Sequence, residues 1–131
     1  MTEQQTPAAI ADATMKELVA CARGRDLAGA LDLFLEDANL FGSGRQEFAG
    51  GRAQLGEFFT MIFAEPFTYG WTWDPPLAGR HDDVVWFVAV AQAVLEGEGA
   101  PPPIPYRLSG VLRLVDDGWR FALFNGAEPA A

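Results

Sequence analysis

Hydrophobic residues recur at helical spacing in three segments of the first half of the chain. Thr6 followed by Pro7 is a typical helix start, because the threonine side chain caps the first turn and proline needs no hydrogen-bonded amide there. Gly24 ends this first run, and Asp26 is placed to cap the next one. The pattern predicts helices over residues 7–24, 26–36 and 51–64.

The second half of the chain shows strand periodicity instead. Tyr69, Trp71 and Trp73 alternate with smaller residues, and the near-continuous apolar run over 84–95 is typical of a central strand buried on both faces. The Asp-Asp-Gly turn at 116–118 separates two further apolar runs and predicts a long hairpin. The predicted strands span residues 38–42, 67–74, 83–96, 105–115 and 118–125.

Helices that precede the strands, rather than alternating with them, predict an α+β fold. We expect one domain over residues 1–131, in which three helices pack on the concave face of a curved antiparallel or mixed sheet. This arrangement forms a cone with an apolar interior. The predicted core consists of Phe34, Phe58, Phe59, Ile62, Phe87, Leu112 and Phe121.

Charge and composition narrow the classes of function. The chain has 18 acidic and 9 basic residues and a formal net charge of −9, which disfavours nucleic-acid binding. No apolar run approaches the about 20 residues of a membrane helix, and residues 1–6 do not resemble a signal peptide. One cysteine, Cys21, and one histidine cannot build a zinc site, and no cofactor motif occurs. We expect a soluble, cytoplasmic protein without a metal, a cofactor, or a nucleic-acid or membrane partner.

Aromatic and basic side chains of the strands could contact a small ligand. Tyr69, Trp71 and Trp73 share one strand face and could form a stacking wall for a flat apolar molecule. Cross-strand packing or a subunit interface explains the same pattern. Arg107 lies in an apolar strand, where it could bind an anionic ligand or pair with a carboxylate such as Glu47.

Glu47 is the leading candidate for a catalytic residue. It could act as a general base or a hydrogen-bond acceptor at the mouth of the cone. It could equally cap the third helix or pair with Arg45 or Arg52. His81 lies in a polar turn and is expected to be a solvated loop residue. The sequence contains no complete catalytic constellation, phosphate-binding loop or nucleophile elbow.

Three segments of the chain resemble one protein family. Residues 26–38 are similar to a second helix that runs into the family's first strand, residues 41–52 to its approach to the third helix, and residues 106–121 to its closing hairpin. Over about residues 12–129, the chain resembles the SnoaL-like branch of the cone-shaped fold shared with nuclear transport factor two and ketosteroid isomerase. The resemblance implies this fold, which serves isomerases, cyclases, dehydratases, binding proteins and dimerisation modules alike.

The chain departs from this family at positions that carry catalysis there. Residues 125–129 read Asn-Gly-Ala-Glu-Pro where relatives often carry His-x-Ser-x-Pro, and residues 40–42 offer no carboxylate. Asn125 can hydrogen-bond a ligand but cannot shuttle protons near neutral pH. We therefore predict that the cone cavity binds a small apolar or weakly anionic molecule without an intact isomerase or cyclase site. The alternatives are an isomerase-, cyclase- or hydratase-type enzyme with Glu47 as general base, and a homodimerisation or interaction module.

We also expect a homodimer. A sheet with so apolar a strand at residues 84–95 exposes one face that helices do not cover, and large apolar patches usually meet a partner. The family resemblance implies that two such sheets pack face to face about a two-fold axis. Trp86 and Trp119 are the candidate interface residues.

Overall fold

Three helices and one seven-stranded sheet make up residues 5–130, the part of the chain that this computed structural model describes. In chain order the elements are α1 (Pro7–Arg23), α2 (Leu27–Asp32), β1 (Phe34–Phe41), β2 (Phe48–Gly50), α3 (Arg52–Phe63), β3 (Thr68–Trp73), β4 (Leu77–His81), β5 (Val84–Glu96), β6 (Ile104–Val115) and β7 (Gly118–Ala127).

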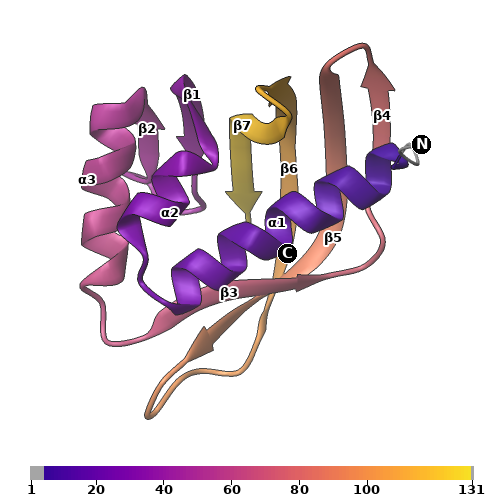
Figure 1. Cartoon of the computed structure of the whole chain (residues 1–131). Coiled ribbons are helices and arrows are strands. Elements are labelled where there is room, and N and C mark those ends of the chain that lie inside the picture. The colour runs from indigo at the N-terminus through magenta and orange to yellow at the C-terminus, as the bar shows by residue number, and fades with distance from the viewer. Residues whose placement is uncertain (1–4, 131) are drawn as a thin grey trace.

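The sheet is mixed, open and curved. Its strands follow the order β2-β1-β7-β6-β5-β3, and β4 pairs with the part of β5 that β3 leaves free. Within residues 5–130, β1 runs parallel to β7 and the other pairings are antiparallel. In Figure 1, α1 crosses the middle strands, while α2 and α3 pack together beside β1 and β2. The predicted α+β class, with three helices on the concave face of a curved sheet, is confirmed.

Local sequence sets the helix starts as predicted. The Thr6 hydroxyl accepts a hydrogen bond from the amide three residues later at 3.1 Å, and Pro7 opens α1. The Asp26 carboxylate accepts a hydrogen bond from the amide three residues later at 3.0 Å, at the start of α2. α3 follows Gly51, whose φ of +85° is a conformation that favours glycine. None of the helices within residues 5–130 is long and apolar enough to span a membrane.

α2 is shorter than the predicted helix over residues 26–36, and this part of the prediction is wrong. β1 begins at Phe34, which is fully buried and aligns with Phe121 of β7. The Phe121 amide donates a hydrogen bond to the Leu33 carbonyl at 2.7 Å. Pairing with β7 therefore overrides the helical spacing of the apolar residues in this segment.

β4 is a strand that the hydrophobic pattern does not indicate. Its sequence, Leu-Ala-Gly-Arg-His, contains no β-branched residue. It pairs in register with β5, with His81 opposite Val84, and Asp82 takes a positive φ of 51° in the connecting turn. This stretch of β5 lies beyond the reach of β3, and without β4 the backbone groups on the edge opposite β6 would be unpaired. Sheet pairing, rather than side-chain pattern, makes the segment a strand.

Side chains of β5 alternate between the two faces of the sheet. Val85, Phe87 and Ala89 point toward the helices and are buried, whereas Trp86 and Val88 are 49% and 53% exposed on the outer face. The expectation that this strand is buried on both faces is wrong. Its apolar outer side chains lie on the face opposite the helices of the described chain.

Most of the predicted core is buried. The residues that expose 5% or less are Phe34, Phe59, Phe87, Leu112 and Phe121. Phe58 and Ile62 were predicted with them but are only half-buried. Both border a cavity instead of being enclosed by packed side chains.

Candidate functional site

An apolar cavity of about 230 Å³ lies between the helices and the concave face of the sheet. α1 contributes Leu18 to its lining, and α3 contributes Phe58 and Ile62. Ala93 of β5 lies opposite Trp71 of β3 in register, and its small side chain leaves room beside the indole. The volume is below the about 300–1,000 Å³ of sites for drug-sized ligands, so it suits a molecule of one or two rings.

Aromatic rings form a large part of the cavity wall. The ring centroids of Trp71 and Phe124 are 5.5 Å apart, and those of Phe58 and Phe63 lie 5.3 and 5.7 Å from that of Phe59. All five rings line the cavity; Phe59 and Phe124 are buried, whereas the other three rings are half-buried. A flat apolar ligand would stack against these rings.

Polar groups gather at one end of the cavity, which we call its mouth. Ser43 and Glu47 lie on the loop between β1 and β2, Tyr106 comes from β6, and Glu128 follows β7. The Tyr106 hydroxyl donates a hydrogen bond to the Ser43 hydroxyl at 3.2 Å. Glu47 Oε1 accepts a hydrogen bond from the Gly44 amide. The mouth therefore offers a phenol, a hydroxyl and carboxylates to the polar end of an apolar ligand.

Two glycines make room for these polar side chains. A β-carbon at Gly44 would collide with the carboxylate of Glu47. A β-carbon at Gly126 would lie 2.7 Å from a ring carbon of Tyr106. Any larger residue at either position would have to displace the neighbouring mouth residue.

Burial and nearby carboxylates keep two phenols of the lining protonated. Burial raises the pKa of Tyr106 above its ordinary value, the hydrogen bond to Ser43 offsets part of this rise, and the charges of Glu47 and Glu128 add to it. Burial also raises the pKa of Tyr69, with smaller contributions from Glu65 and Glu47. Near neutral pH both side chains are therefore neutral hydrogen-bonding groups.

The structure brings three of the six predicted site residues to the cavity, namely Glu47, Tyr69 and Trp71. Trp73 shares a strand face with Trp71 but does not line the cavity. Its indole nitrogen instead donates a hydrogen bond to Asp12 of α1 at 2.8 Å. Trp73 thus braces α1 against β3.

Arg107 and Asn125 lie on the outer face of the sheet, so the expectation that they face the cavity needs correction. Side chains alternate along β6, and Tyr106 and Leu108 point toward the helices, so Arg107 points away from them. Within residues 5–130 it forms no ion pair. Asn125 lies opposite Ser109 on the same outer face and donates a hydrogen bond to its hydroxyl at 3.3 Å.

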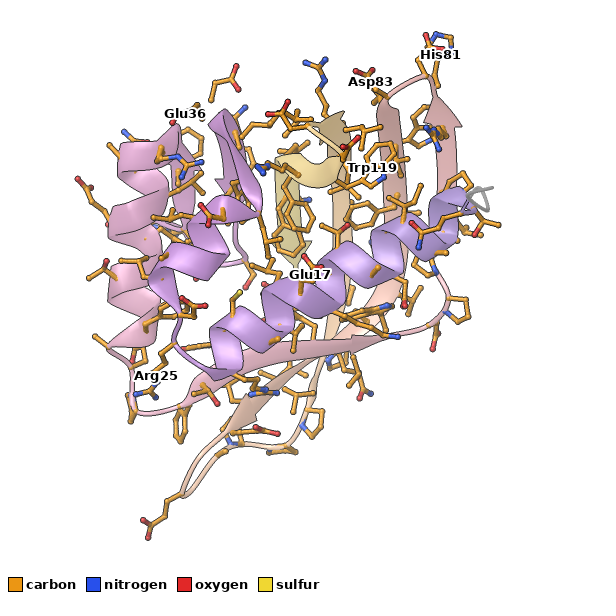
Figure 2. All side chains as sticks on the ribbon, in the orientation of Figure 1. Glu17, Arg25, Glu36, His81, Asp83 and Trp119 are labelled. Atoms are coloured by element: carbon orange, nitrogen blue, oxygen red, sulfur yellow. The ribbon has the colours of Figure 1, made fainter. Side chains whose placement is uncertain are left out.

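Other residues considered from the sequence lie away from the cavity. Figure 2 shows His81 at the outer end of the β4–β5 hairpin, where it is exposed beside Asp82. Arg52 pairs with Glu36 at 3.5 Å instead of with Glu47. In the described part of the chain, no three His, Cys, Asp or Glu side chains form a cluster that could hold a metal ion.

Ser43, Tyr106 and Glu128 are cavity residues that the sequence analysis did not select. Tyr106 had a usable signal, because alternate residues from Tyr106 to Leu112 share one strand face and Leu112 was predicted to be core. Ser43 and Glu128 lie in irregular segments that follow strands. No periodicity there indicates which side a side chain takes.

Solved structures with this fold span nearly the whole chain. A proposed aromatic ring hydroxylase from Novosphingobium aromaticivorans has a TM-score of 0.82 at 20% identity, and the match covers 98% of this chain and 94% of that one. A proposed dehydratase of the NTF2-like family from Streptomyces avermitilis has a TM-score of 0.83 at 12% identity, with 95% and 96% covered. A protein of unknown function with a cystatin-like fold from Nostoc punctiforme has a TM-score of 0.79 at 13% identity, with 100% and 97% covered. At these identities the likeness shows the fold alone.

Sequence comparison identifies the family. No curated protein sequence matches the chain. The profile of the SnoaL-like domain, however, matches residues 11–124, which include every element except the ends of α1 and β7. The chain therefore belongs to the SnoaL-like domain family.

Proposed function

We propose that this protein binds a small, mainly apolar molecule in the cone cavity. The observation that carries the proposal is a cavity of about 230 Å³ with aromatic side chains in its walls and with most of its polar groups at its mouth. Apolar sites with a few convergent polar groups are typical of small-molecule binding. The rings of the ligand stack against Phe58 and Trp71, and its polar end meets Glu47 and Tyr106.

Binding is tested with 2-naphthol as the probe, by calorimetry and by tryptophan fluorescence. Trp71 borders the cavity and Trp73 does not. We therefore expect Trp71→Phe to abolish the change in emission caused by the probe and Trp73→Phe to keep it, because only an indole at the wall loses contact with water. No heat of binding, or an emission change that survives Trp71→Phe, would contradict the proposal.

A second candidate function is proton-transfer catalysis of the isomerase, cyclase or hydratase type. The position of Glu47 favours it, because this carboxylate lines the cavity close to the phenol of Tyr106. A general base must reach the proton that it removes, and a carboxylate at the mouth of an apolar cavity can do so.

The catalytic candidate is tested by deuterium exchange at the acidic C–H groups of 2-tetralone, followed by NMR. Glu47→Gln should lower the protein-dependent exchange rate at least about a hundredfold, as expected for a lost general base. The variant should still bind 2-naphthol, because glutamine keeps a hydrogen-bond acceptor at this position, and this binding shows that the cavity is intact. Equal exchange rates for the two proteins would remove Glu47 as a base.

We also propose that the outer face of the sheet pairs with a second copy of the chain. Exposed apolar side chains support this, since Leu77, Trp86, Val88 and Val90 are 75%, 49%, 53% and 68% exposed. Patches of this kind usually meet a partner. Trp119, the other interface residue expected from the sequence, lies on the helix side of the sheet instead (Figure 2).

Sedimentation of the wild type and of Trp86→Glu tests the dimer. A charge at this position should be costly to bury in an interface, so we expect a dimeric wild type and a monomeric variant. Ala53→Glu places the same charge on the exposed side of α3 and should stay dimeric. A wild type that sediments as a monomer at micromolar concentration would refute this proposal.

The cytoplasmic location expected from the sequence remains a prediction, supported by the only cysteine. Cys21 is free and half-buried, and burial raises the pKa of its thiol. Such a thiol is poorly reactive and needs no oxidising compartment. Fractionation of cells that produce the tagged chain would test the location.

A further inference from the structure

We infer that the ligand of this cavity carries a protonated amine at its polar end, held at the mouth by Glu47 and the surrounding aromatic rings. This inference rests on the proposed function and specifies its ligand class. It replaces the weakly anionic ligand expected from the sequence.

The charged side chains that line the cavity are acidic. Among residues 5–130, the lining contains two carboxylates, Glu47 and Glu128, and no lysine, arginine or histidine. Both carboxylates are close enough to Tyr106 for their charges to raise the pKa of its phenol. An anionic ligand would meet like charge at the mouth, whereas an organic cation would be attracted.

Nearby arginines are directed elsewhere. Arg23 follows a lining residue of α1, but it donates hydrogen bonds to two backbone carbonyls, one on β3 and one on β5, and pairs with Glu96 at 3.4 Å. Arg107 points to the outer face of the sheet. Arg45 lies in the loop that carries Glu47, but it is exposed and does not line the cavity. The negative charge of the mouth is therefore not neutralised within the cavity.

The walls suit an organic cation as well as an apolar body. Tyr69, Trp71 and Tyr106 border the cavity, and the faces of such rings attract ammonium groups within about 6 Å. Glu47 can still accept hydrogen bonds, because the described residues occupy only its Oε1, through the Gly44 amide. A carboxylate beside aromatic rings provides both the ion pair and the ring faces that recognise an alkylammonium group.

Three probes with one ring system test the inference, namely 2-naphthylmethylamine, 2-naphthylmethanol and 2-naphthoate, each titrated by calorimetry at neutral pH and low salt. We expect the amine to bind at least about tenfold more tightly than the alcohol, and the carboxylate to bind most weakly. If the alcohol or the carboxylate binds at least as tightly as the amine, this inference is overturned while the proposed function stands. If neither these probes nor 2-naphthol bind, the proposed function fails as well.

Glu47→Gln shows whether the mouth recognises the amine. Glutamine keeps the size of the side chain and an acceptor for the Gly44 amide, and it removes the charge. We expect this variant to weaken amine binding about tenfold and alcohol binding less than about twofold. Glu57→Gln is the matched control, because Glu57 is exposed on α3 outside the cavity. An equal loss in both variants would assign the preference to overall charge and overturn the inference.

Discussion

The two ends of one aromatic cluster differ in how they are filled. At the closed end Phe121 is fully buried, and its ring centroid lies 5.0 Å from that of Phe34, 5.1 Å from Phe124 and 6.4 Å from Phe87. At the open end Trp71 packs on the same Phe124 at 5.5 Å, but its other side borders the cavity. The rings form one continuous cluster, yet only Trp71 and its neighbours at the open end border the cavity.

Aromatic content therefore does not distinguish a packed core from a cavity wall. The size of the residue beside each ring determines whether that ring is enclosed or borders the cavity. Phe87 completes the packing at the closed end, whereas the small side chain of Ala93 leaves space beside Trp71. Close packing stabilises the closed end, while the open end lacks contacts that a bound ligand would supply.

The largest expected effect is a difference between the two ends in how much the loss of one ring lowers the free energy of unfolding. Phe121→Ala should lower the free energy of unfolding by about 3–5 kcal/mol, because it leaves a hole in a packed region. Phe58→Ala should cost less than about 2 kcal/mol, because its ring already borders empty space. Urea unfolding of both variants measures the difference. Equal losses would mean that the open end is packed like the closed end.

Gly126→Ala changes the open end, and its main expected effect is on ligand affinity rather than on the free energy of unfolding. The added methyl group would lie 2.7 Å from the Tyr106 ring, so the phenol has to shift into the cavity mouth. We expect the affinity for 2-naphthol, measured by calorimetry, to fall at least about tenfold. Gly118→Ala is the control in the same strand, because its methyl group would make only an ordinary contact at 3.7 Å. An unchanged affinity in Gly126→Ala would argue that the phenol position does not matter.

Much of the fold follows from local pattern and turn chemistry. The helix starts after Thr6 and Asp26 and the long strands β5 and β6 lie within a residue or two of their predicted places. The end of α2 and the existence of β4 could not be predicted, because both depend on pairing with distant strands. Phe34 becomes a strand residue by aligning with Phe121, which is far away in the sequence.

The candidate site was harder to predict than the fold, because it depends on which strand face turns toward the helices. Alternation groups Tyr106 with Leu112 and places Arg107 on the other face. The predicted burial of Leu112 was therefore enough to indicate which face of β6 turns toward the helices. For Trp73 no local signal exists, since its partner Asp12 lies 61 residues away on α1. Packing of α1 across the sheet, rather than strand periodicity, separates Trp73 from Trp71.

The smallest expected effect concerns the hydrogen bond between Trp73 and Asp12, which holds the Trp73 indole against α1 and away from the open end. Asp12 accepts the indole hydrogen bond and pairs with Lys16 at 2.9 Å on the surface of α1. The hydrogen bond from Lys16 lowers the pKa of Asp12 below its ordinary value of 3.8, and the bond from Trp73 adds to this. A lowered folded-state pKa means that the stabilisation is present above pH 3.8 and is lost as the pH falls through the lower folded value.

Asp12→Asn should therefore destabilise the protein by less than about 1 kcal/mol at neutral pH, because the ion pair is largely exposed and screened by solvent. Asparagine keeps an acceptor for the indole, so the variant removes the charge and leaves the brace. In urea unfolding from neutral to acid pH, the gap between wild type and variant should close below pH 3.8, where the wild-type carboxyl also becomes neutral. A difference in the free energy of unfolding that stays constant with pH would show that the charge of Asp12 does not contribute to stability.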